Sequence, residues 1–137
     1  MFDTGDEAME GLSSFARDRG LTAAHFSGIG AFEEVVLGYF AWDRKEYEEI
    51  PIEEQVEVVA LTGDVALKDD EPTVHAHVVV ARSDGSASGG HLLSARVRPT
   101  LEVILTESPA HLRKRYDEEA GVALIALDEV EPPQRER

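Results

Sequence analysis

The sequence predicts an α+β domain that has a mixed, mostly antiparallel sheet, one long N-terminal helix and a short C-terminal helix. Apolar residues first recur at helical spacing, and from residue 22 the period changes toward two, with many β-branched residues between short turns. The chain has 137 residues, enough for one domain with a single hydrophobic core. We therefore expect one domain over residues 1–130, followed by a disordered tail at 131–137 that contains two prolines.

The long helix is predicted over residues 6–19. Thr4 and Glu7 have the spacing of a capping box, in which the two side chains satisfy backbone N–H groups at the start of a helix. Apolar residues then repeat on one face as far as Phe15, and Gly20 supplies a helix stop. Little sequence precedes this helix, so any strand before it is expected to be a stub.

The rest of the chain is predicted to form strands joined by turns. The glycine-rich segment 28–31 indicates a tight turn or bulge, and 68–72 a charged loop. Residues 109–116 are expected to form the short C-terminal helix. The expected strands are residues 23–27, 35–42, 46–50, 56–62, 65–67, 73–82, 90–97, 100–106 and 121–127.

The chain is strongly acidic. It holds 28 Asp and Glu against 13 Lys and Arg, for a formal net charge of −15. Such a surface repels a phosphate backbone, so we expect no direct binding to nucleic acid. Many carboxylates with few lysines are typical of a halophilic cytoplasm, although an ordinary acidic protein remains the alternative.

The sequence contains no cysteine, no apolar run of transmembrane length and no segment that resembles a signal peptide, and we expect these absences to exclude several kinds of site and location. The chain has no cysteine, so any metal must be held by histidine, carboxylate or backbone oxygen. No apolar run reaches transmembrane length, and the first residues do not resemble a signal peptide. We therefore expect a cytoplasmic protein with no membrane partner.

Three histidines are predicted to converge on one face of a β-hairpin. His75 and His77 alternate with Ala76, so both imidazoles point the same way. If residues 83–85 form a three-residue loop with glycine in its left-handed position, His91 lies opposite His77. Neutral imidazoles with an open fourth position suit a catalytic zinc ion, or another divalent metal. A satisfied polar cluster is the alternative, and a one-residue slip would turn His91 away.

Two carboxylates are the candidate catalytic groups. Glu57 and Glu102 stand within apolar strands, where a buried carboxylate needs a partner. Each could support the metal site or act as a general base for hydrolysis. An ion pair with Arg96 or Arg98 is the structural alternative.

Six short segments, taken in order, carry a resemblance to a known family. They are Phe-Ser-Gly-Ile-Gly-Ala at 26–31, Leu-Gly-Tyr-Phe at 37–40, Glu-Val-Val-Ala-Leu-Thr-Gly at 57–63, His-Ala-His-Val at 75–78, Gly-Gly-His-Leu at 89–92 and Leu-Glu-Val at 101–103. Together they resemble the plants and prokaryotes conserved (PPC) domain, in particular its stand-alone prokaryotic members. The resemblance implies a homotrimer whose histidines form a metal site near the subunit boundary. In land plants the domain is joined to AT-hook segments that bind DNA, whereas this chain has no Arg-Gly-Arg-Pro hook.

Three functions from different classes follow. The first is a trimeric metal-binding domain of uncharacterised activity, with metal-dependent hydrolysis of an unknown small-molecule substrate as one option. The second is an interaction or assembly module whose histidines are structural. The third is a DNA-binding regulator related to the plant AT-hook proteins, which the negative charge disfavours. Bound metal would separate the first function from the second.

Overall fold

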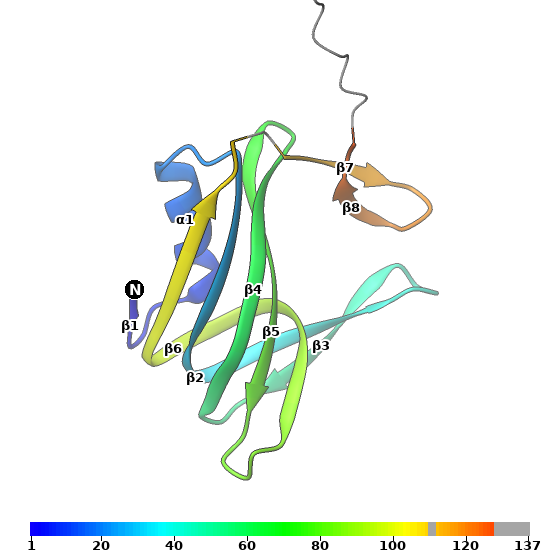
Figure 1. Cartoon of the computed structure of the whole chain (residues 1–137). Coiled ribbons are helices and arrows are strands. Elements are labelled where there is room, and N and C mark those ends of the chain that lie inside the picture. The colour runs from blue at the N-terminus through cyan, green and yellow to red at the C-terminus, as the bar shows by residue number, and fades with distance from the viewer. Residues whose placement is uncertain (110–111, 128–137) are drawn as a thin grey trace, which may run out of the picture.

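The structure is a computed structural model that describes residues 1–109 and 112–127, and sheet dominates it (Figure 1). The elements in chain order are β1 (Phe2–Asp3), α1 (Ala8–Asp18), β2 (Ala23–Ala41), β3 (Glu46–Ile52), β4 (Val56–Lys68), β5 (Glu71–Ala81), β6 (Ala87–Glu107), β7 (Arg113–Asp117) and β8 (Val122–Ile125). Within these residues no helix has the length and apolar character needed to span a bilayer. The predicted tail at 131–137 lies outside the described residues.

The predicted α+β class is wrong, because the described chain is a mostly β fold with one short helix. Helix α1 has 11 residues, and β7 replaces the described part of the predicted C-terminal helix. In β7, Lys114 is turned inward while Arg113 and Arg115 are exposed, which is the period of a strand. The strand pairs in parallel with the end of β4 at Leu67 and then turns back into β8. Its backbone groups are therefore satisfied by pairing, which the local sequence alone did not reveal.

The N-terminal helix begins later than predicted, and its cap is a different residue. Glu7 is the N-cap, and its carboxylate accepts from the Glu10 N–H at 2.6 Å and from the Ala95 N–H at 2.7 Å. Thr4 does not cap the helix, because its hydroxyl donates to the Pro99 carbonyl instead. Through its two hydrogen bonds, Glu7 connects the first turn of α1 to strand β6. The expected stub before the helix is present as β1.

Several predicted strands are joined into longer ones. Strand β2 continues through residues 28–31 with a register shift between Gly28 and Gly30, which confirms the bulge predicted there. A side chain at position 30 would overlap the Thr100 carbonyl, so only glycine allows this close approach. Similarly, β4 and β6 each unite two predicted strands. The predicted loop at 68–72 is only a turn, at Asp69 and Asp70, both of which have positive φ.

Strands β2, β6, β5 and β4 pair in a closed ring, since β2 pairs with β6 and also with β4. The inward side chains of this ring form the core, and α1 packs its buried face against β5 and β6. The β2–β3 arm and the β7–β8 hairpin project from the other side of the ring (Figure 1). Residues that alternate with the core positions therefore face outward. The largest fully buried side chains are Phe26, Phe32, Leu37, Leu61, Leu92 and Leu101.

Candidate metal centre

The hairpin that carries the three histidines has the predicted register. The Arg82 N–H donates to the Ser86 carbonyl at 2.8 Å, and Gly85 in the loop has a φ of 82°. Strand β5 therefore pairs with β6 so that His77 lies directly opposite His91. Directly opposed residues point to the same face of a sheet, so all three imidazoles lie on the outer face of the ring.

The three imidazoles form one compact cluster. One ring nitrogen from each of His75, His77 and His91 lies within 4.8 Å of the other two. Ring centroids are 5.0 Å apart for His75 and His77, 5.0 Å for His75 and His91, and 5.6 Å for His77 and His91. His77 is exposed, and the other two are half-buried. The cluster is thus open to solvent on one side.

The donor set fits a divalent ion such as zinc. Tetrahedral zinc with bonds of about 2.0–2.1 Å to nitrogen holds its ligand atoms about 3.3 Å apart, so modest ring rotations would suffice to close the site. His91 Nδ1 is buried and has no hydrogen-bond partner among the described residues. A buried polar atom without a partner is unfavourable, and coordination would satisfy it.

The protonation states of His75 and His91 also favour metal binding. Burial, followed by the nearby charges of His75, His77 and Lys114, lowers the pKa of His91 to about 4. Burial likewise lowers the pKa of His75, with smaller effects from Lys114 and His77 that exceed the opposing effect of Asp64. Both imidazoles are therefore neutral at neutral pH, the form that binds metals.

An aromatic side chain from the β2–β3 arm packs on the cluster. The ring centroid of Tyr47 lies 4.7 Å from that of His91, and the ring centroid of Phe40 lies 5.2 Å from that of Tyr47. Gly38 pairs with His91 in the sheet, and a methyl group there would come within 3.0 Å of the Tyr47 ring. The absence of a side chain at Gly38 thus allows Tyr47 to reach His91.

A buried ion pair stands on the opposite side of the cluster. Lys114 Nζ lies 2.8 Å from Asp64 Oδ1, and the Lys114 side chain is only 6 % exposed. This contact is within ion-pair distance but lacks hydrogen-bond alignment, since Asp64 Oδ1 has no hydrogen-bond partner among the described residues. Asp64 is directly opposite His75 in the pairing of β4 with β5. The ion pair therefore belongs to the surroundings of the histidines.

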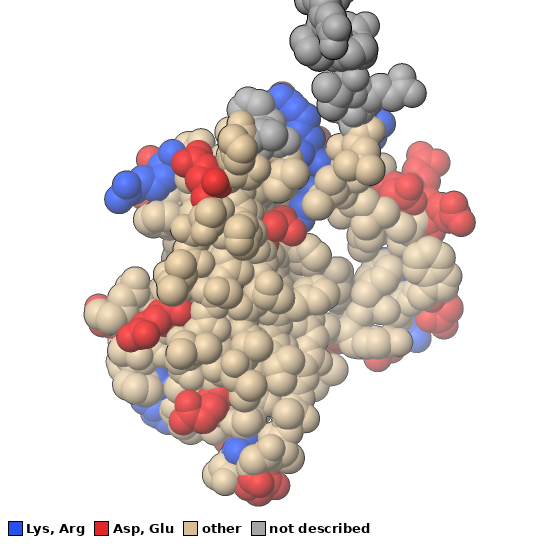
Figure 2. Space-filling model, in the orientation of Figure 1, with Lys and Arg blue, Asp and Glu red and all other residues tan. Residues whose placement is uncertain are grey.

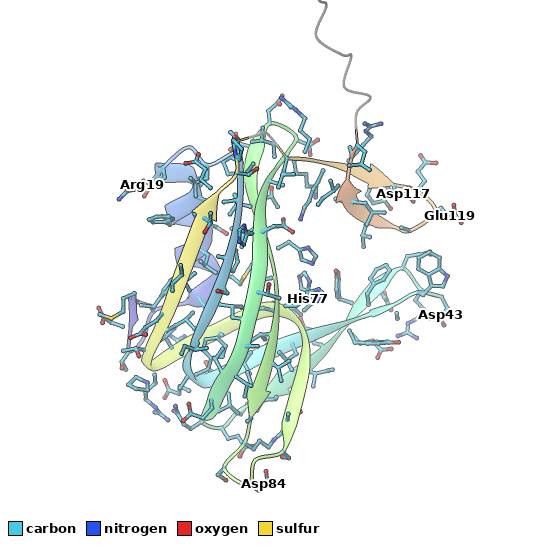
Figure 3. The ribbon with its side chains drawn as sticks, in the orientation of Figure 1. Arg19, Asp43, His77, Asp84, Asp117 and Glu119 are labelled. Atoms are coloured by element: carbon cyan, nitrogen blue, oxygen red, sulfur yellow. The ribbon has the colours of Figure 1, made fainter. Side chains whose placement is uncertain are left out.

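Two projecting segments flank the cluster. His77 points into the region between the β2–β3 arm, marked by Asp43, and the β7–β8 hairpin, marked by Asp117 and Glu119 (Figure 3). The turns of these segments approach each other, because a methyl group at Gly121 would lie 2.9 Å from Lys45 Cβ. The cluster thus lies between the β2–β3 arm and the β7–β8 hairpin.

The candidate bases lie apart from this cluster. Glu57 and Glu102 are both exposed, and they line a shallow hollow together with Ile29 and Val59. The predicted arginine partners bind elsewhere, because Arg98 pairs with Glu33 at 2.9 Å and Arg96 with Glu34 at 3.5 Å.

Sequence reasoning did not identify Lys114, Asp64 or Tyr47 as neighbours of the histidines. The helix expected over residues 109–116 does not predict an inward Lys114, whereas the alternation of strand β7 turns it inward. His25 is exposed in β2 and lies outside the cluster, and His111 lies outside the described residues.

A family model described as the Plants and Prokaryotes Conserved (PCC) domain, also abbreviated PPC, matches residues 1–109 of this chain. No curated protein matches. Among solved structures, a PPC protein from Pyrococcus horikoshii is 32 % identical, with a TM-score of 0.86, and the match covers 94 % of this chain and 90 % of that one.

Two further solved structures resemble the chain as closely. A metal-containing protein from Archaeoglobus fulgidus is 34 % identical, with a TM-score of 0.84 and coverage of 92 % of this chain and 89 % of that one. A Ralstonia eutropha protein with a proposed DNA-binding role is 31 % identical, with a TM-score of 0.85 and coverage of 92 % and 88 %. The comparisons therefore do not support the expectation that this chain avoids nucleic acid.

Proposed function

This chain belongs to the Plants and Prokaryotes Conserved domain family, and we propose that it is a trimeric metal-binding member of it. In this proposal His75, His77 and His91 hold one divalent ion, zinc in the first instance. The observation that carries the proposal is the convergence of three imidazoles, one of which has a buried nitrogen without a hydrogen-bond partner among the described residues. The metal-containing relative from Archaeoglobus fulgidus supports it.

The residues around the cluster suit the binding of a small ligand beside such an ion. A divalent ion supplies Lewis acidity to whatever occupies its open position. Tyr47 lies at one side of the cluster and Lys114 at the other. His77 is exposed, so a ligand can reach the ion from solvent. Hydrolysis is the reaction class that a divalent ion with an open position favours. The proposed catalytic role of Glu57 and Glu102 does not include proton transfer at this ion, because a general base must lie within hydrogen-bond reach of the proton that it takes. Since both line a separate hollow, we expect glutamine at either position to leave metal affinity unchanged.

A DNA-binding role is the second candidate, and it rests on the proposed role of the relative from Ralstonia eutropha. The net charge of −15 opposes it, because each phosphate contact would have to overcome repulsion from surrounding carboxylates. A titration with duplex DNA at several salt concentrations distinguishes the candidates. Tight binding of DNA that weakens as the salt concentration rises would favour the DNA-binding role.

The metal proposal is tested by metal analysis and calorimetry on untagged protein. We expect about one zinc per chain, and His77→Ala should lower zinc affinity at least about 100-fold, because only two imidazoles remain. The fold should persist, since His77 is exposed and contributes nothing to the core. Circular dichroism and thermal unfolding check this.

His25→Ala is the matched control. His25 is an exposed histidine on neighbouring β2, and it also faces outward, yet it is not part of the cluster. Its loss should leave zinc affinity within about twofold of the wild type. If wild-type protein binds no zinc, cobalt or nickel, the metal proposal is wrong and the histidines belong to an interaction module.

A further inference from the structure

Lys114 occupies a position that a metal site alone does not explain. Its side chain is 6 % exposed, and its ammonium contacts Asp64 Oδ1 at 2.8 Å. This contact is not aligned as a hydrogen bond, because Asp64 Oδ1 has no hydrogen-bond partner among the described residues. An ammonium has three donors, and buried donors are normally all bonded. The contact with Asp64 therefore does not occupy the donors of Lys114 in an aligned hydrogen bond.

Lys114 also lies within electrostatic reach of the histidines. Asp64, its ion-pair partner, is directly opposite His75 across the β4–β5 pairing. The positive charge of Lys114 contributes to lowering the pKa of both His75 and His91. The ammonium thus lies near the histidine cluster, beside a residue that is paired with His75.

The charges of the loaded site do not balance without a further group. Three neutral imidazoles with a divalent ion carry two positive charges, and the single carboxylate of Asp64 offsets only the charge of Lys114. A lysine beside a metal site repels the ion, so alone it would weaken metal binding. An anion lying between the ion and the ammonium would remove this conflict and would offer Lys114 an aligned acceptor.

We propose that the histidine cluster and Lys114 together bind the oxyanion group of a small molecule, a carboxylate or a phosphate. One oxygen of this group coordinates the metal at its open position, and another accepts a charge-assisted hydrogen bond from Lys114. The ring of Tyr47, against His91, offers an apolar surface to the rest of the ligand. This inference rests on the proposed metal site.

The test uses the full chain loaded with cobalt, whose visible absorption responds to a change of ligand. Acetate and inorganic phosphate are titrated separately at fixed ionic strength. We expect at least one of them to bind with millimolar or tighter affinity. Lys114→Met should weaken that binding at least about tenfold, because one charge-assisted hydrogen bond is lost. Cobalt affinity should be kept or increased, because a like charge is removed.

Two further variants separate this role from a general loss of structure. Lys68→Met removes an exposed lysine that lies opposite Lys114 in the β4–β7 pairing, and it should leave oxyanion affinity unchanged. Asp64→Asn removes the ion-pair partner but keeps Lys114, so oxyanion affinity should be kept or increased. A merely structural ion pair would predict losses for both Lys114→Met and Asp64→Asn, and that result would overturn the inference.

The outcomes also separate this inference from the proposed function. A wild-type protein that binds no metal contradicts the metal proposal itself. A wild-type protein that binds cobalt but neither anion at 10 mM, or a Lys114→Met variant with full anion affinity, overturns the oxyanion site alone. A response to acetate only identifies a carboxylate as the ligand group, and a response to phosphate only identifies a phosphate.

Discussion

His91 is the residue on which the candidate centre depends most. It lies on β6 and adds a third imidazole to the two on β5. Its Nδ1 is buried and has no hydrogen-bond partner among the described residues. Two glycines, Gly89 and Gly90, precede it, and a methyl group at Gly90 would come within 2.7 Å of the Gly38 carbonyl. The close approach of β6 to β2 therefore requires glycine at this point. The close packing of these two strands therefore helps to fix the position of His91.

The lowered pKa of His91 predicts a pH-dependent stability for the metal-free protein. The unfolded state takes up a proton near the ordinary pKa of about 6.5, whereas the folded state does so only near 4. The unfolded state thus binds more protons between these values, and His91 reduces stability as the pH falls from about 6.5 to about 4. Thermal unfolding of chelator-treated protein measures the effect.

The comparison variant is His91→Gln, which cannot be protonated in this range. Carboxylates also titrate below pH 6, so only the difference between wild type and variant is informative. We expect the wild type to lose more thermal stability than His91→Gln between pH 7 and pH 4. If the unfolding midpoints of the two proteins fall in parallel with pH, the folded state does not lower the pKa of His91 and the prediction is wrong.

At the scale of elements, β6 is the longest strand and it leaves part of one edge uncovered. Its C-terminal half pairs with β2 on one side, whereas on the other side the described residues pair only at Thr100 and Leu101, through β1. On the outer face of this half, Ile104 is 77 % exposed, and Ile29 on neighbouring β2 is 61 % exposed. Figure 2 shows a broad uncharged area over β6, β2 and β4, although the chain is strongly acidic. An open strand edge beside an apolar face is a surface that proteins usually cover.

We expect other copies of the chain to cover this surface, as the proposed homotrimer requires. Light scattering should give a mass near three times 15.0 kDa. Ile104→Glu should shift the mass toward that of one chain, because a charge would be buried in the interface without a partner. Phe15→Glu makes the same change at an exposed residue of α1, and it should leave the mass unchanged. A wild-type monomer at both moderate and high salt would refute the trimer.

At the scale of the whole molecule, the excess of carboxylates is the dominant feature. Acidic residues occur around the margin of the uncharged area in Figure 2. Few lysines offset them, because the sequence contains only Lys45, Lys68 and Lys114. The ion pairs among the described residues are formed mainly by arginine, and most of them are exposed and therefore contribute little. Repulsion among the remaining carboxylates thus opposes folding at low salt.

We expect thermal stability to rise with salt, in keeping with the proposed halophilic origin. Raising KCl from 0.1 M to 1 M shortens the screening length from about 10 Å to about 3 Å, so repulsion between exposed carboxylates falls sharply. The unfolding midpoint should rise by at least about 5 °C. A neutral osmolyte such as sucrose at equal osmolality is the control, since it favours compact states without screening charge. A flat salt profile would exclude the halophilic interpretation.

Part of the candidate site could be predicted from the sequence because it depends on local rules. The alternation of His75 and His77 follows from the period of a strand, and the loop ending in Gly85 sets which residue lies opposite His77. These features involve neighbours in the chain, so their physical causes are present in a short window of sequence. The register of this hairpin is accordingly as predicted. The zinc ion, the trimer and the roles of Glu57 and Glu102 remain predictions.

The sequence by itself thus determined the hairpin that unites the histidines, the bulge in β2 and the acidic character of the surface. Only the tertiary structure decided that residues 113–117 form a strand, because their partner, the end of β4, lies more than forty positions away in the sequence. The same pairing turns Lys114 inward to Asp64 and places a buried cation beside the imidazoles. Local periodicity cannot distinguish five residues of a surface helix from five of an edge strand. Which of the two forms depends on whether another strand offers free backbone groups, and that is a property of the folded chain.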